Sequence, residues 1–132
     1  MKPACDVLVV DDEEVVRSAI ALVLTQEGLT VTGVADADAA LAHPDLSRCR
    51  LVLCDIMLPG RSGMEVLSAL RTLRPELPIV MITGYATPAQ EQTVYAAGAA
   101  AFLPKPFDES ELLTLVRQML STPEELKPLP HS

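Results

Sequence analysis

The sequence predicts an α/β protein built on a five-stranded parallel sheet, doubly wound so that helices cover both of its faces. Five short apolar runs recur along the 132 residues, and a segment of helical character follows each of them. Gly, Pro and Asp residues stand between these segments, where turns and helix ends are expected. Strands that alternate with helices pair in parallel, because each helix carries the chain back to the same end of the sheet.

The first two strands are expected at residues 5–10 and 29–34, where Val and Leu are frequent. Between them, Asp11 and Asp12 lead into a helix that ends at Gly28, and a helix dipole favours acids at its start. A short Ala-rich helix at 35–42, closed by Pro44, precedes a third strand at 51–54. Because this third run is apolar throughout, we expect it to be buried on both faces.

The second half of the chain repeats the pattern. A helical stripe of Met, Val and Leu at 64–73 leads to a fourth strand at 79–82. A weaker, more polar helix follows at 88–97, and then a fifth strand at 100–103. The last helix is expected to begin at Asp108, whose side chain and that of Glu111 have capping-box spacing, and to end at Leu120.

Length and composition limit the class of protein. We expect one domain at residues 1–120, followed by a polar, Pro-bearing tail or the start of a linker at 121–132. The net charge of −8 disfavours direct binding to nucleic acid or to an anionic membrane. No apolar run approaches the ~20 residues of a membrane helix, and Asp6 stands where a signal peptide would be apolar. These features favour a cytoplasmic location.

The three cysteines, Cys5, Cys49 and Cys54, lie in or beside the apolar runs. An odd number without CxxC spacing is typical of reduced, buried thiols. We therefore expect neither a disulfide nor a zinc site.

Polar residues follow four of the five strands. Asp11 and Asp12 follow the first, Asp55 the third, Thr83 the fourth and Lys105 the fifth. In an open parallel sheet the carboxyl ends of the strands lie along one edge, where binding sites form. We expect these side chains to converge there.

This set of side chains favours phosphoryl chemistry. Clustered carboxylates suit a hard cation, Mg²⁺ or Mn²⁺, that retains several waters. Lys105 would offset part of the negative charge and hold an anion, and Thr83 would donate to a phosphoryl oxygen. A carboxylate in such a site can attack phosphorus and form an aspartyl phosphate.

Taken together, the motifs resemble the receiver domain of two-component response regulators, a CheY-like, flavodoxin-like (βα)5 sandwich. The strings LVLCDIMLPGRSG, PIVMITGYA and AGAAAFLPKPF carry the resemblance, which covers about residues 5–120. It is nearest to receivers that precede sigma-54 activator modules (the NtrC type) or are attached to hybrid histidine kinases.

The resemblance implies a role for each matched position. Asp55 would accept a phosphoryl group from a phosphohistidine. Mg²⁺ would be bound by Asp12 directly, by Asp11 through water, and by Asp55 and the backbone carbonyl of Met57. Thr83 and Lys105 would hold the phosphoryl oxygens.

It also implies a conformational switch. Phe102 stands at the position of the switch aromatic and would turn inward when Thr83 moves toward the phosphoryl group. The Lys105–Pro106 bond is usually cis in the family. The moving surface would be residues 87–120, which would also form a homodimer, although Ala100 and Ala101 replace acids used in one common dimer. Phe102 in place of the more frequent Tyr offers no hydroxyl to a partner.

The expected partner is a sensor histidine kinase or a phosphotransfer protein. The domain would be a phosphoacceptor in signalling and not a conventional enzyme, promoting its own phosphorylation and a slow loss of phosphate. Large side chains at Met57 and Tyr85 would shield the phosphoryl group from water.

Other interpretations of the same residues stay open. Asp11 and Asp12 could be helix caps, Lys105 a surface lysine and Phe102 plain core. A phosphatase of the haloacid dehalogenase type would need a second acid two residues after Asp55, where Met57 stands. A flavodoxin-like cofactor protein is excluded, because its first loop must cradle phosphate and the acidic loop here would repel it. A receiver-like binding module that is never phosphorylated would share the fold.

Overall fold

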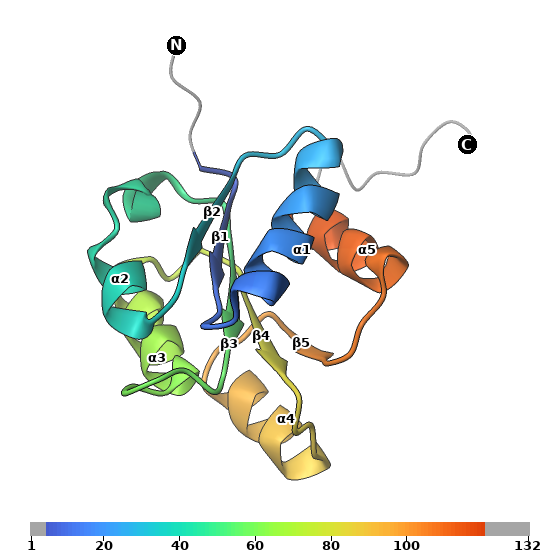
Figure 1. Cartoon of the computed structure of the whole chain (residues 1–132). Coiled ribbons are helices and arrows are strands. Elements are labelled where there is room, and N and C mark those ends of the chain that lie inside the picture. Colours follow the sequence, from blue (N-terminus) through green and yellow to red (C-terminus); the bar gives the residue numbers. More distant parts are fainter. Residues whose placement is uncertain (1–4, 121–132) are drawn as a thin grey trace, which may run out of the picture.

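A parallel five-stranded sheet forms the centre of the molecule (Figure 1). The computed structural model describes residues 5–120, so the predicted tail at 121–132 lies outside the described residues. The strands follow the order β2-β1-β3-β4-β5, and every neighbouring pair is parallel. The strands are β1 (Val7–Val10), β2 (Val31–Val34), β3 (Leu51–Asp55), β4 (Ile79–Thr83) and β5 (Ala101–Pro104).

The helices form a layer on each face of the sheet. Helices α1 (Glu14–Gln26) and α5 (Glu109–Leu120) lie together on one side, while α2 (Ala37–Ala42) and α3 (Gly63–Leu73) lie on the other (Figure 1). Helix α4 (Pro88–Ala96) packs with the second layer through Val94, its one buried side chain. The doubly wound α/β fold predicted from the sequence is confirmed.

Alternation along the central strands builds a core on each face. In β1, Val7 and Val9 pack toward α1 and α5, whereas Leu8 and Val10 pack toward α2 and α3. The same division holds in β3, where all five residues are buried. A strand covered on both faces needs apolar side chains at every position, which is why the run at 51–54 reads as continuous.

Helix ends follow the capping chemistry in the sequence. Ser62 and Glu65 form a capping box at the start of α3. Asp108 and Glu111 do the same for α5, with backbone-to-carboxylate distances of 2.8 and 2.9 Å, as their spacing predicted. Strand and helix limits differ from the predictions by one or two residues.

One helix was not predicted. A 3-10 helix, η1 (Pro44–Arg48), follows α2, and the side chain of His43 accepts a hydrogen bond from the Asp45 amide at 3.0 Å. The sequence pattern predicts Pro44 only as the end of the preceding helix. The fixed φ of proline also suits the first position of a new helical turn, so the residue that ends α2 also begins η1.

The connection from β3 to α3 brings two backbones into contact. The Gly63 amide donates to the Ile56 carbonyl at 2.8 Å. A Cβ at Gly63 would collide with the carbonyl oxygen of Asp55. Glycine is therefore needed here for close approach of the backbone, and it sets where β3 ends relative to α3.

Gly63→Ala should lower the free energy of unfolding by about 1–3 kcal/mol, because the methyl group forces the β3 end and α3 apart. Urea denaturation monitored by circular dichroism measures this loss. Gly84→Ala is the matched control, since a Cβ there meets nothing within 4 Å and the backbone needs no positive φ. Equal stability of the two variants would contradict the close-approach argument.

Candidate functional site

The polar residues predicted at the strand ends lie along one edge of the sheet. Asp11 directly follows β1, Asp55 and Thr83 are the last residues of β3 and β4, and Lys105 follows β5. Strands β1 and β3 are neighbours, and the chain order reverses between them. A crevice at the carboxyl ends of the strands is expected at such a reversal.

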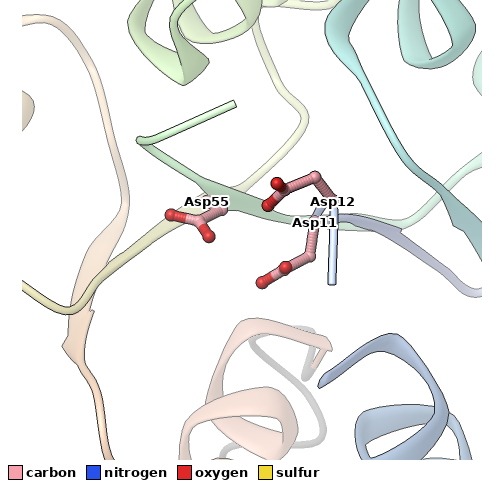
Figure 2. A group of neighbouring side chains, drawn as sticks. All are labelled: Asp11, Asp12 and Asp55. Atoms are coloured by element: carbon pink, nitrogen blue, oxygen red, sulfur yellow. The ribbon is translucent and has the colours of Figure 1, made fainter. Parts of the chain in front are cut away.

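Three carboxylates meet at this point (Figure 2). One oxygen from each of Asp11, Asp12 and Asp55 lies within 4.8 Å of the others. Asp11 and Asp55 are buried, with 1% and 4% of their surface exposed, while Asp12 is exposed. Like charges this close disfavour full ionisation unless cations offset them.

Lys105 supplies a positive charge to the cluster. Its Nζ donates to Asp55 Oδ2 at 3.0 Å and lies 3.2 Å from Asp11 Oδ2 and 3.6 Å from Glu13 Oε1. Burial alone would lower the pKa of Lys105, but the Asp55 and Asp11 carboxylates outweigh it and raise that pKa. One ammonium group therefore faces several acids, and the site keeps an excess of negative charge.

Asp55 sits where burial and hydrogen bonding oppose each other. Its Oδ1 accepts the Met57 amide at 3.0 Å, and its Oδ2 accepts Lys105. Burial is the largest influence and raises the pKa of Asp55; the Lys105 and Met57 hydrogen bonds lower it, and the Asp11 charge raises it again. The net pKa is above the ordinary value, so the carboxylate is more basic than a solvated one.

One feature of the carboxylate cluster supports the binding of a hard cation there. Asp11 Oδ1 accepts the Glu13 amide at 2.9 Å, but Oδ2 is buried and has no hydrogen-bond partner among the described residues. The 3.2 Å ion pair with Lys105 does not have hydrogen-bond geometry. A buried, unsatisfied carboxylate oxygen in an oxygen-rich cluster is compatible with binding a metal ion.

Asp11 combines the bonding of a cap with a place in the cluster. The predicted alternative, a simple helix cap, is met only in part, because the N-cap position of α1 is Glu13 and makes no side-chain cap. Asp11 Oδ1 accepts a hydrogen bond from the Glu13 amide, just before the helix. Its other oxygen remains in the carboxylate cluster.

Thr83 ends β4 and Phe102 lies in β5, the two strands beyond β3 in the sheet. Thr83 is buried, and its hydroxyl accepts the Tyr85 amide at 3.1 Å; no hydrogen bond links it to Asp55 in residues 5–120. Phe102 is half-buried and packs against the core cluster on the α2–α3 face. The Lys105–Pro106 bond is cis, as expected.

Sequence reasoning missed a residue that supports the acidic loop. Arg17 of α1 donates from Nη1 to the Asp11 carbonyl at 2.7 Å. Its side chain passes over Gly33 of β2, where a Cβ would lie 3.2 Å from Arg17 Cδ. A glycine inside a strand indicates such an approach, so Gly33 was the available signal.

The chain is similar to known proteins over most of its length. Residues 7–117 match the family described as the response regulator receiver domain. Sensory transduction protein RegX3 of Mycobacterium bovis is 37% identical over 114 residues, covering 86% of this chain and 50% of that protein. Nitrogen assimilation regulatory protein NtrX of Azorhizobium caulinodans is 35% identical over 121 residues, covering 90% and 27%. The chain thus spans half or less of the length of these relatives.

Solved structures give the same result. The receiver domain of NtrX from Brucella abortus has a TM-score of 0.82 and 37% identity, with 89% of this chain and 99% of that chain covered. Chemotaxis response regulator CheY4 of Vibrio cholerae has a TM-score of 0.81 and 31% identity, with 89% and 100% covered. Within residues 5–120, no helix is long and apolar enough to cross a bilayer.

The resemblance seen in the sequence motifs is therefore confirmed over the whole described fold. The acidic cluster lies at the carboxyl ends of the strands of a CheY-like sandwich. It pairs with Lys105 from the loop after β5. The chain belongs to the response regulator receiver domain family, the signalling domain of two-component systems, whose standard function is phosphorylation on an aspartate.

Proposed function

We propose that Asp55 is the phosphoryl acceptor of this receiver and that Mg²⁺ is required for its phosphorylation. The observation that carries the proposal is the bonding of Asp55. A buried carboxylate with a raised pKa is held by Lys105 at 3.0 Å, next to an Asp11 oxygen that has no hydrogen-bond partner in the described part of the chain. Such a group is nucleophilic, and the Lys105 ammonium beside it can offset part of the negative charge of an incoming phosphoryl group.

The phosphoryl donor is a phosphohistidine of a sensor histidine kinase or phosphotransfer protein. A carboxylate oxygen of Asp55 attacks phosphorus, a P–O bond forms, and the P–N bond to the imidazole breaks. The imidazole leaves with the electron pair of that bond and takes up a proton. Lys105 remains protonated and faces the phosphoryl oxygens, where charge is greatest.

Four groups of the chain would hold the cation. They are the carboxylates of Asp11, Asp12 and Asp55 and the backbone carbonyl of Met57, a set of oxygens that suits Mg²⁺, with Mn²⁺ as a substitute. When bound, the ion neutralises charge on the carboxylates and on the incoming phosphoryl group. Lys105 and the ion then share the task of offsetting the negative charge of the site.

Phosphorylation shifts an equilibrium between two conformations of the domain. Thr83 exchanges the Tyr85 amide for a phosphoryl oxygen, and Phe102 moves into the vacated space. The responding surface is residues 87–120, where α4 has little to anchor it beyond Val94. This face is also our candidate for a homodimer contact.

The proposal also includes the limits of the domain. Residues 1–120 form the receiver, and residues 121–132 form a tail or the start of a linker to an output module. The net charge of −8 argues that this chain does not itself bind nucleic acid or an anionic membrane. A cytoplasmic location is part of the same proposal. A second candidate, a receiver that is never phosphorylated, has the same fold and is tested by the first experiment below.

With a small phosphodonor and Mg²⁺, the chain should gain about 80 Da, the mass of one phosphoryl group. The adduct should be absent in Asp55→Asn and after chelation of the metal, because each removes a required group. Intact-mass spectrometry measures it. Asp38→Asn is the control, since Asp38 is 81% exposed and pairs with Arg61 away from the cluster. An adduct that persists in Asp55→Asn would show that another residue is the acceptor.

Lys105→Met should raise the pKa of Asp55 further, because it removes the charge and hydrogen bond that now lower it. The midpoint of carboxyl ¹³C chemical shift against pH measures the change. Arg61→Met, which removes a cation paired with Asp38 and Glu65, should leave the midpoint unchanged. A midpoint that falls in Lys105→Met would contradict the assigned role of the ammonium.

Met57→Asn should speed loss of the phosphoryl group roughly tenfold, about 1.4 kcal/mol in the barrier. The Met57 side chain is 58% exposed at the mouth of the site, where its bulk would screen water and a polar amide would position it. Decay of the phosphorylated form, followed by mass, measures the rate, and Met57→Leu should keep the slow rate. Unchanged decay in Met57→Asn would remove the shielding role.

A further inference from the structure

Two cysteines lie together at the edge of the sheet opposite to the carboxylate cluster. Cys5 stands just before β1 and Cys49 just before β3, and their Sγ atoms are 3.7 Å apart. Both side chains are buried, and all three cysteines of the chain are free thiols. The sequence separates the pair by 44 positions, so their spacing alone gave no sign of the contact.

The two thiols have matching local geometry. Cys5 Sγ lies 3.3 Å from the Val7 carbonyl oxygen, and Cys49 Sγ lies 3.4 Å from the Leu51 carbonyl oxygen. Val7 and Leu51 are themselves partners in the β1–β3 ladder. Neighbouring strands lie about 4.8 Å apart, which is inside the Cα–Cα range of about 4.4–6.8 Å that a disulfide spans.

We propose that Cys5 and Cys49 form a peroxide-reactive dithiol, which is oxidised to an intramolecular disulfide that joins the start of β1 to the start of β3. Closing the 3.7 Å gap to a bond of about 2.0 Å takes about 1.7 Å of sulfur movement. A metal site is a poorer use of the pair, because the metal-ligand cluster found in residues 5–120 is the one at Asp11, Asp12 and Asp55.

Cys5 is the sulfur that reacts first. The hydrogen bond from Cys49 is the largest influence on it and lowers the pKa of Cys5 to about 7, although burial and the charge of Asp45 act to raise it. The same hydrogen bond and burial raise the pKa of Cys49, so that thiol keeps its proton. Cys5 also retains 4% of its surface against 1% for Cys49. Thiolate character and access both select Cys5.

Hydrogen bonds from Arg74 hold the backbone around Cys49 in place. Arg74 donates from Nη1 to the carbonyls of Leu46 and Cys49 at 2.9 and 2.8 Å. Cys5 precedes β1 and lies outside the strand itself. Segments at an element's outer end open locally at lower cost than a strand centre, which gives a small oxidant a route to the Cys5 sulfur.

The reaction with hydrogen peroxide balances without another reagent. The Cys5 thiolate attacks one peroxide oxygen, the O–O bond breaks, and the departing hydroxide takes a proton to become water. The Cys49 sulfur then attacks Cys5 Sγ; the S–O bond breaks, and hydroxide leaves with the Cys49 proton as a second water. Two thiols and one peroxide give one disulfide and two waters.

Alkylation after peroxide treatment of the full chain tests the proposal. The oxidised protein should lose about 2 Da, for two hydrogen atoms, and react with N-ethylmaleimide at Cys54 alone once denatured. Peptide mapping should find Cys5 joined to Cys49. The rate should rise with pH and level off above about 7, as the Cys5 thiolate becomes the main form. A thiol reductant should restore three reactive cysteines.

Matched variants separate this chemistry from the carboxylate site. Cys54→Ala should still form the disulfide, and Asp55→Asn should form it at the wild-type rate. Cys49→Ala should stop at a sulfenic acid on Cys5, detectable with dimedone. Mapping of the wild-type chain keeps the test decisive even if a variant fails to fold. Three thiols that stay reactive after peroxide, or a disulfide that involves Cys54, would overturn the proposal.

Discussion

The contact between the Lys105 ammonium and the carboxylates of Asp55 and Asp11 is the interaction on which the site depends. Distances of 3.0 and 3.2 Å place one cation between two buried acids. Without it, two nearly buried negative charges would face each other, and at least one would be driven to its neutral form. With it, Asp55 remains available as a carboxylate while its pKa stays above the ordinary value. The site keeps a negative excess that favours a hard cation.

The fold makes that contact possible by fixing the backbone or the side chain at a few positions. Lys105 comes from the loop after β5, two strands away from β3, and reaches Asp55 because all strand ends face the same edge. Gly63 allows α3 to start against the Asp55 backbone, and Arg17 holds the Asp11 carbonyl. Gly63 and Arg17 thus act on the backbone of the two acids, while Lys105 acts on their side chains. The site has few reactive groups, and their relative positions depend on the rigid sheet beneath them.

The opposite edge of the sheet carries different chemistry on the same two strands. Strands β1 and β3 end at the carboxylate cluster and begin beside the Cys5–Cys49 pair. The strands themselves are fully buried, so both edges border the same two cores, one on each face of the sheet. The acids gather because parallel strands end together, and the thiols meet because the same strands also begin together.

The sequence alone determined the fold class, the five strands and helices, and the edge at which the polar residues gather. It could do so because apolar runs, caps and turns are local signals, and parallel pairing places every strand end on one side. Asp11, Asp12, Asp55 and Lys105 were predictable for that reason. The resemblance of the motifs supplied the family and the cis Lys105–Pro106 bond.

Tertiary structure decided what depends on distances between segments remote in the chain. Among residues 5–120 it left Asp11 Oδ2 without a hydrogen-bond partner, paired the Thr83 hydroxyl with the Tyr85 amide, and brought Arg17 to the acidic loop. It turned Pro44 into the first residue of η1 and set Cys5 against Cys49. Residue types and spacing carry no such information, because packing and hydrogen-bond geometry arise only when the helices and strands are assembled.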